Sequence, residues 1–160
     1  CREAIEATRF STYEENIRGC EIRESIASNI VVMGNLEQLI QVFVNLIKNA
    51  YEAMAGQKER QIEIQGDIDP KNPKMARIDF IDNGPGIPPD ILPKIWAQGF
   101  TTKARKGDSI GASGQGQGLF VSKHMIESIH KGTITAESTI GKGTTFIIRL
   151  PLADVQEGQS

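Results

Sequence analysis

The amino-acid sequence predicts an α+β protein, a two-layer sandwich in which helices cover one face of a mixed, largely antiparallel sheet. Residues 35–55 and 118–130 place apolar side chains at helical spacing, which is typical of helices with one buried face. Residues 60–82 and 131–152 each hold two alternating apolar and polar segments close together in the chain, which is typical of β-hairpins. The length of 160 residues fits one domain.

The first third of the chain predicts a polar helix, two strands and a strong amphipathic helix. Residues 2–16 predict the polar helix, and residues 19–25 and 28–34 predict two short strands joined by a turn. Asn35 is a good N-cap for the amphipathic helix, and Gln38 follows three residues later, as in a capping box. The apolar stripe of this helix consists of Leu36, Leu39, Ile40, Phe43, Leu46, Ile47, Ala50 and Met54.

The rest of the chain predicts two hairpins with a loop region and a second helix between them. The first hairpin turns at PKNPK, residues 70–74, and residues 89–96 predict a short helix. Residues 101–118 then form a loop that is too long to be idle in a compact domain. The second amphipathic helix covers residues 118–130, and the last hairpin turns at TIGKG, residues 139–143.

Composition narrows the classes of function. The chain has 18 basic and 20 acidic side chains, and this balance argues against a nucleic-acid binder, which carries a basic excess. No apolar run reaches about ten residues, so we expect no membrane contact by this segment. Cys1 and Cys20 are too few for a disulfide framework, which favours a reducing cytosol. We expect a fragment of a longer protein, with a domain at 17–152 between an N-terminal helix or linker at 1–16 and a polar tail at 153–160.

Two asparagines, Asn45 and Asn49, stand one helical turn apart at the edge of the apolar stripe. In projection they are about 40° from each other. Amide oxygens are hard, neutral ligands that suit Mg²⁺ held beside phosphates. Two solvated amides on a polar helix face are the alternative interpretation.

The stretch DNGPGIPPD, residues 82–90, is an unusual way for a chain to leave a strand. A carboxylate at Asp82 can accept a hydrogen bond from an exocyclic amine. Gly84 and Gly86 allow positive φ and let a flat ligand approach the backbone, and three prolines stiffen the edge of the pocket. An ordinary rigid turn is the alternative interpretation.

A third element, with Gly114, Gly116 and Gly118, leads directly into the helix at 118–130. Exposed backbone N–H groups beside a helix N-terminus form an anion site, although a flexible linker is the alternative. Neither the Rossmann spacing nor the Walker pattern is present. Phosphate binding here would therefore belong to another architecture.

In this order, the motifs resemble those of the ATP-binding domain of the histidine kinases. NLIKNAYEA resembles the Asn box, DNGPGI the first glycine box, WAQGFTTK the F box, GQGQGL the second glycine box and GKGTTF its closing strand. The resemblance covers residues 20–151 and extends to the fold shared with the gyrase, mismatch-repair and heat-shock chaperone ATPases. Trp96 and Gly99 depart from the usual F box.

The resemblance implies ATP and Mg²⁺ as cofactors and a role for each matching residue. Asn49 would hold Mg²⁺ through its amide oxygen, and Asp82 would accept a hydrogen bond from the adenine amine. Residues 101–113 would form the ATP lid, and Thr144 would lie near the adenine. The implied nucleotide-binding residues are Asp82, Gly84, Gly86, Ile87, Phe100, Thr101, Thr102, Lys103, Gly114, Gly116, Gly118, Leu119 and Thr144, with Lys48 as a weaker phosphate candidate.

Position 45 separates the relatives within this superfamily. In the gyrase-like ATPases, the residue one turn before the metal Asn is a Glu that activates water. Asn45 cannot act as a strong base, which favours a kinase over a hydrolase, so the resemblance implies Asn45 and Asn49 as the catalytic residues. His124 and His130 lack the neighbouring Glu and Pro of a phosphoacceptor, so we expect both to be ordinary helix residues.

The resemblance thus implies the catalytic domain of a sensor histidine kinase in two-component signal transduction. Its phosphoryl acceptor would be a His on a separate dimerisation domain of the same protein, continuous with residues 1–16, and a response regulator would act downstream. The full-length protein would be a homodimer, cytoplasmic or the cytosolic part of a membrane-anchored sensor. Two alternatives stay open, a serine kinase of the same superfamily and a non-catalytic nucleotide-sensing domain.

Overall fold

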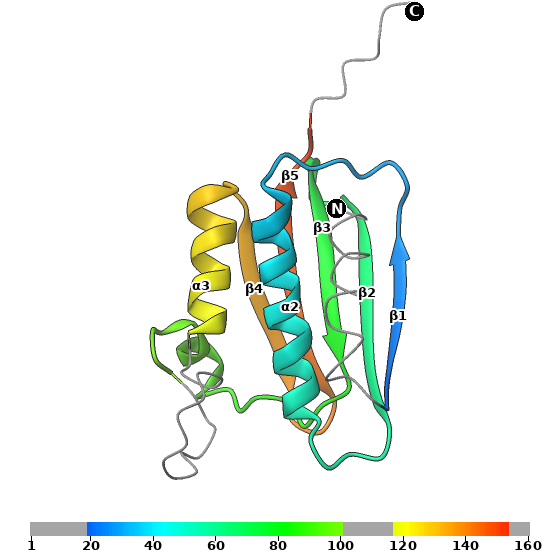
Figure 1. Ribbon diagram of the computed structural model, residues 1–160, viewed down its shortest axis with the longest axis vertical. Coiled ribbons are helices and arrows are strands. Elements are labelled where there is room, and N and C mark those ends of the chain that lie inside the picture. The colour runs from blue at the N-terminus through cyan, green and yellow to red at the C-terminus, as the bar shows by residue number, and fades with distance from the viewer. Residues whose placement is uncertain (1–18, 101–116, 154–160) are drawn as a thin grey trace, which may run out of the picture.

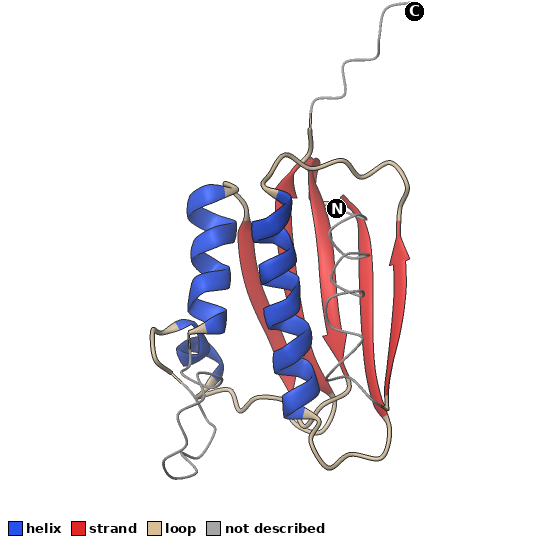
Figure 2. Ribbon diagram, viewed as in Figure 1, coloured by secondary structure: helices blue, strands red, loops and turns tan. Residues whose placement is uncertain are grey.

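The computed structural model describes residues 19–100 and 117–153, which form a five-stranded sheet with helices packed on one face (Figures 1 and 2). The strands are β1 (Cys20–Ile26), β2 (Arg60–Asp69), β3 (Asn72–Asp82), β4 (Thr133–Thr139) and β5 (Gly143–Pro151). The helical elements are α2 (Leu36–Ala53), the 3₁₀ helix η1 (Leu92–Trp96), α3 (Gly118–His124) and the π-helical turn η2 (Met125–Ile129). The predicted two-layer α+β architecture is confirmed, while the predicted helix at 2–16 lies outside the described residues.

The strand order across the sheet is β1-β2-β3-β5-β4. β1 pairs with β2 in parallel, and the other three pairs are antiparallel. The prediction of a second strand at residues 28–34, hairpinned to the first, is wrong. In the described part of the chain, this segment contributes a single bridge, between Val32 and Leu152. A parallel pair needs a crossover connection, and these residues carry the chain from the edge strand β1 over to α2 (Figure 1).

The turn between β2 and β3 is shorter than predicted, since only residues 70–71 separate the strands. Asp69 stabilises it, because Oδ1 accepts a hydrogen bond from the Lys71 N–H at 2.9 Å and Oδ2 accepts one from Arg149 Nε at 2.6 Å. The Lys71 N–H, with a smaller contribution from Arg149, lowers the pKa of Asp69 below its usual 3.8. The carboxylate therefore stabilises the fold above pH 3.8, and this contribution is lost as the pH falls through the lowered pKa.

The N-terminus of α2 is capped by Asn35, as predicted, but only half of the capping box forms. Asn35 Oδ1 accepts a hydrogen bond from the Gln38 N–H at 3.0 Å. The Asn35 N–H donates to Nε2 of His130 at 3.1 Å instead of to the Gln38 side chain. Nδ1 of His130 in turn donates to the carbonyl of Met125 at 2.8 Å. The buried imidazole thus joins two helices, with its proton on Nδ1 and Nε2 as the acceptor.

The second predicted helix is present but changes type along its length. α3 ends at His124, and the following π-helical turn is closed by a hydrogen bond from the His130 N–H to the Met125 carbonyl at 3.1 Å. The wider turn points Ile126 into the core and leaves Ile129 47% exposed. None of the helices in residues 19–100 and 117–153 is long and apolar enough to cross a membrane.

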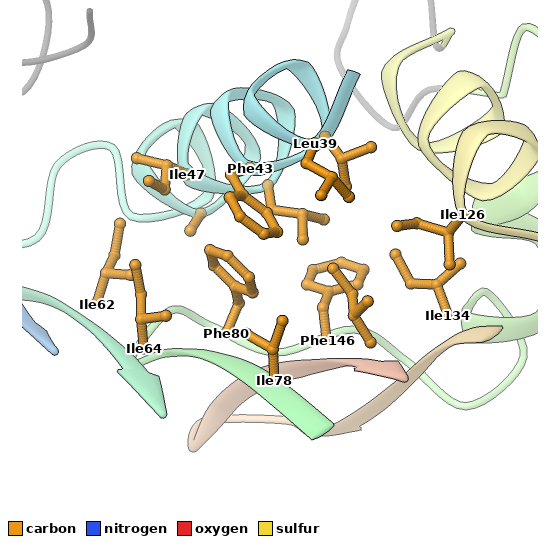
Figure 3. Packing of buried hydrophobic residues seen from close by; sticks show 14 of the residues in the cluster. Leu39, Phe43, Ile47, Ile62, Ile64, Ile78, Phe80, Ile126, Ile134 and Phe146 are labelled. Carbon is orange, nitrogen blue, oxygen red and sulfur yellow. The ribbon is translucent and has the colours of Figure 1, made fainter. Parts of the chain in front are cut away.

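The core lies between α2 and the sheet, where side chains from both layers interdigitate (Figure 3). Phe43 of α2 stacks on Phe80 of β3 with ring centroids 5.1 Å apart. Ile126 and Ile134 extend the core beneath the second helix (Figure 3). Leu36 departs from its predicted place in the apolar stripe, because it stands at the first turn of α2 and is 44% exposed.

Phe43→Ala is expected to lower the free energy of unfolding by about 3–5 kcal/mol, because it opens a cavity opposite Phe80. Leu36→Ala is the control in the same helix and is expected to cost less than about 1 kcal/mol. Urea denaturation followed by circular dichroism measures both changes. Equal losses would contradict the placement of the core on the Phe43 side of α2.

Candidate functional site

The loop after β3 and the turn between β4 and β5 meet at the end of the sheet where α2 also ends (Figure 1). The N–H of Gly141 donates to the carbonyl of Pro85 at 2.8 Å, which joins the two segments directly. From the end of α2, the Met54 Cγ would lie 3.5 Å from a Cβ built on Gly84. The fold therefore brings the first glycine box, the closing strand and the end of α2, which carries the Asn box, to one corner.

Asp82, the last residue of β3, is 6% exposed. Its Oδ1 accepts hydrogen bonds from the N–H groups of Gly84 at 2.8 Å and Thr144 at 3.3 Å. Burial raises the pKa of Asp82 above its usual 3.8, and these two N–H groups act in the opposite direction. Its contribution to stability is therefore greatest below pH 3.8 and declines as the pH rises through the raised pKa. Oδ2 makes no hydrogen bond to a described residue, so it can accept one from a ligand.

The glycines of this corner are needed for contacts within the protein. A Cβ on Gly84 would lie 2.7 Å from Asp82 Oδ1. Gly86 has a φ of 79°, and a Cβ there would collide with the carbonyl of Thr139. Gly143 has a φ of 110°, and a Cβ there would collide with the carbonyl of Asp82. This close packing of backbones is a reason for glycine that the sequence did not indicate, and ligand approach at Gly84 and Gly86 stays a prediction.

Ser138, which sequence reasoning missed, joins the two segments through one hydroxyl group. Its Oγ accepts a hydrogen bond from the Ile87 N–H at 2.8 Å, lies 2.9 Å from the Gly143 carbonyl and lies 2.9 Å from Thr144 Oγ1. Thr144 is 6% exposed and stands opposite Asp82 in the pairing of β3 with β5. The only feature of the sequence that could have indicated Ser138 is its position directly before the predicted TIGKG turn, with Thr144 directly after that turn.

Asn83, also missed, ties the loop after β3 back to β2. Its Oδ1 accepts a hydrogen bond from the Gln61 N–H at 2.8 Å, and its Nδ2 donates to the Glu59 carbonyl at 3.3 Å. An amide directly after a strand is a common turn signal. Asn83 thereby fixes the direction in which the chain leaves Asp82.

The two asparagines of α2 have different environments. The Nδ2 of Asn45 donates to the Gly118 carbonyl at 3.4 Å and to Ser122 Oγ at 3.3 Å, so Asn45 ties α2 to the first turns of α3. Asn49 is half-buried, and its side-chain amide makes no hydrogen bond within the described ranges. Asn49 can therefore offer its oxygen to a ligand, while Lys48 is exposed beside it.

Trp96 anchors the segment that precedes residue 101. Its ring meets Phe146 edge-on at 6.0 Å, and the Lys123 ammonium lies 5.4 Å from its centroid. Three predicted contact residues, Ile87, Phe100 and Leu119, are half-buried against the core, and Gly118 opens α3. The predicted contacts Thr101, Thr102, Lys103, Gly114 and Gly116, and the predicted lid at 101–113, lie outside the described residues.

The chain is similar in sequence to known signalling proteins. The family described as histidine kinase-, DNA gyrase B-, and HSP90-like ATPase matches residues 34–154. Sensor protein FixL of Bradyrhizobium diazoefficiens is 36% identical over 124 residues, which are 78% of this chain and 22% of FixL. Sporulation kinase A of Bacillus subtilis is 36% identical over 139 residues, which are 86% of this chain and 21% of that kinase. The chain thus spans about a fifth of the length of these curated relatives.

The chain is also similar in structure to a solved histidine kinase domain. The nucleotide-free catalytic domain of histidine kinase ThkA superposes with a TM-score of 0.75 at 28% identity, covering 94% of this chain and 91% of that domain. Full-length ShkA in complex with AMPPNP, at 19% identity and a TM-score of 0.69, shares the fold over 95% of this chain and 29% of its own. The family and fold that the five motifs predicted are confirmed.

Gly143→Ala is expected to lower the free energy of unfolding by more than about 3 kcal/mol, because the new methyl group collides with the Asp82 carbonyl. Gly141→Ala, in the same turn, is the matched control. Gly141 has a φ of 78°, and a Cβ there meets no described atom within 4 Å. Only backbone strain of about 1–2 kcal/mol is expected for the control. Thermal denaturation distinguishes the two, and equal melting temperatures would contradict the close backbone packing.

Proposed function

The chain belongs to the histidine kinase-, DNA gyrase B- and HSP90-like ATPase family, as a catalytic domain of the histidine kinase type, and we propose that it transfers the γ-phosphoryl group of Mg-ATP to a histidine on a separate dimerisation domain. The observation that carries the proposal is the buried Asp82 carboxylate with one oxygen fixed and the other free. The acceptor domain belongs to the same protein, outside this chain. The full-length protein acts as a cytoplasmic or membrane-anchored homodimer that passes the phosphoryl group to a response regulator.

Base recognition rests on Asp82. Because Gly84 and Thr144 hold Oδ1, the free Oδ2 accepts a hydrogen bond from the exocyclic amine of adenine. Guanine has a carbonyl at that position, which a carboxylate repels. Oδ2 needs no rearrangement to bind the amine, since the two backbone N–H groups already fix the carboxylate plane.

The side chains around the site fit a magnesium ion bound together with the nucleotide phosphates. The amide of Asn49 is half-buried and makes no hydrogen bond to a described residue, and its oxygen is a hard neutral ligand. No cluster of three or more His, Cys, Asp or Glu that could hold a metal lies in the described ranges. Most of the negative charge around the ion would therefore come from the phosphates, and Asn49 would hold the ion from α2. When bound, Mg²⁺ neutralises charge on the transferring group.

Asn45 supports transfer rather than hydrolysis. A hydrolase of this superfamily needs a base that activates water, whereas an amide cannot take up a proton near neutral pH. Asn45 Nδ2 is also engaged by Gly118 and Ser122 of α3. We therefore assign two roles to Asn45. It holds α3 beside α2, and it leaves water unactivated, so that ATP is not hydrolysed before the acceptor histidine reaches the γ-phosphoryl group.

The acceptor has to come from outside the chain. His130 is buried, and both ring nitrogens are hydrogen-bonded within the fold, which removes it as a nucleophile. His124 is exposed and is the last residue of α3, and it belongs to none of the three motifs that meet at the Asp82 corner. A histidine on a dimerisation helix pair can instead reach the γ-phosphate in line, which is the geometry that phosphoryl transfer requires.

Asp82→Asn is expected to weaken ATP binding by about 1–3 kcal/mol, because the charge-assisted acceptor is replaced by an amide. Wild-type protein should bind Mg-ATP in preference to Mg-GTP, and the variant should lose this preference. Isothermal titration calorimetry with both nucleotides measures the four affinities. Equal affinity of the wild-type protein for ATP and GTP would show that Asp82 does not select the base.

The same titration repeated at falling pH tests the protonation of Asp82. Burial raises the pKa of this carboxyl, so lowering the pH toward that pKa protonates the acceptor and weakens ATP binding. Because the phosphates also take up protons at low pH, the Asp82→Asn variant is the reference. The ratio of wild-type to variant affinity should fall toward one, and a constant ratio would contradict recognition by the ionised form.

Asn49→Ala is expected to abolish phosphoryl transfer to a dimerisation helix pair of the full-length protein that carries the acceptor histidine. The assay incubates the chain with γ-labelled ATP, with and without that partner. The chain alone should take up no stable label, and the partner should gain an acid-labile, base-stable label. Gln41→Ala, an exposed amide two turns before Asn49 in α2, is the control and should transfer normally. Labelling of the chain alone, or an acid-stable label, would favour a serine kinase.

A further inference from the structure

We propose that Ser138 is a specificity-determining residue that acts through Thr144, by turning the Thr144 hydroxyl so that it accepts hydrogen bonds from the bound base. The inference rests on the proposed function, since it concerns the base-binding corner around Asp82. It assigns a role to a residue on β4 that belongs to none of the five sequence motifs.

The directions of the hydrogen bonds follow from counting protons at Ser138. The Ile87 N–H can only donate, so Ser138 Oγ accepts there at 2.8 Å. The Gly143 carbonyl can only accept, so Ser138 donates its single proton there at 2.9 Å. The contact of 2.9 Å between Ser138 Oγ and Thr144 Oγ1 then has Thr144 as the donor. In this arrangement all three partners of Ser138 are satisfied, because a serine hydroxyl has one proton and two lone pairs.

This arrangement decides what Thr144 can offer to a ligand. Its only hydroxyl proton points at Ser138, so only lone pairs remain on the other side of Oγ1. Asp82 stands opposite Thr144 in the sheet register, and the Thr144 N–H donates to Asp82 Oδ1 at 3.3 Å. Directly opposite residues of an antiparallel pair have their side chains on the same face. The base-binding corner therefore presents two neighbouring acceptors, the Asp82 carboxylate and the Thr144 hydroxyl.

Two neighbouring acceptors favour the binding of a purine that carries an amine at position 6 and disfavour the binding of one that carries a carbonyl there. An amine has two protons to donate, one to each acceptor, whereas a carbonyl has none and leaves only the adjacent N1 proton for the two acceptors. Without Ser138, the Thr144 hydroxyl is free to rotate and to donate to a carbonyl. Ser138 would thus increase the preference for a 6-amino purine over a 6-carbonyl purine that Asp82 already provides.

A purely structural role for Ser138 predicts a different outcome. The same hydroxyl joins the loop after β3 to the turn between β4 and β5, so its removal could loosen the corner as a whole. A loosened corner would weaken the binding of every nucleotide to the same extent. Orientation of Thr144 instead changes the ratio between nucleotides, and this ratio is the quantity to measure.

The test compares the affinities of Mg-ATP and Mg-ITP, whose bases differ only in the amine or carbonyl at position 6 and the matching proton on N1. Isothermal titration calorimetry is applied to wild-type protein and to Ser138→Ala, Ser138→Thr, Thr144→Val and the Ser138→Ala/Thr144→Val double variant. The preference for ATP is expected to fall about three- to tenfold in Ser138→Ala. It should be retained in Ser138→Thr, which keeps the hydroxyl. In the Thr144→Val background, Ser138→Ala should change the preference no further.

The outcomes separate the inference from the proposed function. An unchanged ATP preference in Ser138→Ala, or an equal loss for both nucleotides, would overturn the role of Ser138 alone. Failure of the wild-type protein to bind either nucleotide would overturn the proposed function and the inference with it. Circular dichroism melting checks each variant, and Ser138→Cys replaces Ser138→Ala if the alanine variant does not fold. Because a thiol is a weak hydrogen-bond acceptor, Ser138→Cys should also lower the preference for ATP.

Discussion

The Asp82 carboxylate imposes the tightest constraint on this domain, because it stays buried with one oxygen fixed and the other free. Removing an ionised carboxylate from water is costly unless hydrogen bonds replace the lost hydration. Two backbone N–H groups do so, from Gly84 and from Thr144 across the sheet. Both need close backbone packing, and at Gly143 that packing leaves no room for a side chain. The register of β3 with β5, the glycines and the binding corner therefore meet at the same carboxyl group.

Helix α2 connects this corner to the rest of the fold through two of its faces. One face packs Phe43, Leu46 and Ile47 into the core, which fixes the helix on the sheet. Its polar edge holds α3 through the hydrogen bonds of Asn45 to Gly118 and Ser122. Asn49 lies one turn further along α2, so its position follows from both contacts. A change that rotates α2 would disturb the core, the packing of the two helices and the proposed metal ligand together.

Local sequence pattern predicted the elements that depend on local physics, namely α2, both hairpins and the helix after residue 117. It also named candidate site residues, because family motifs keep their order in the chain; the fold places Asp82, Gly84 and Thr144 together, and their roles stay predictions. It could not predict that β1 pairs in parallel with β2, since partner choice depends on a crossover rather than on alternation. The capping box was half wrong because its acceptor is His130, 95 positions away. Ser138 was missed because a hydroxyl in a strand of Ser and Thr is typical of a solvated surface, and only the register places it opposite Thr144.

Under the proposed function, the residues of the site orient the nucleotide and help to neutralise its charge. None of them acts on the γ-phosphate as a nucleophile or strong base. Asp82 and Thr144 would hold the base and Asn49 the metal, while Asn45 holds α3 through its hydrogen bonds to Gly118 and Ser122. His130 is not available as an acceptor, because both of its ring nitrogens are hydrogen-bonded within the fold. In phosphoryl transfer, positioning and charge neutralisation are most of what a protein contributes. In this proposal, the domain holds ATP without hydrolysing it, and the encounter with the acceptor domain would then be the step at which phosphoryl transfer is controlled.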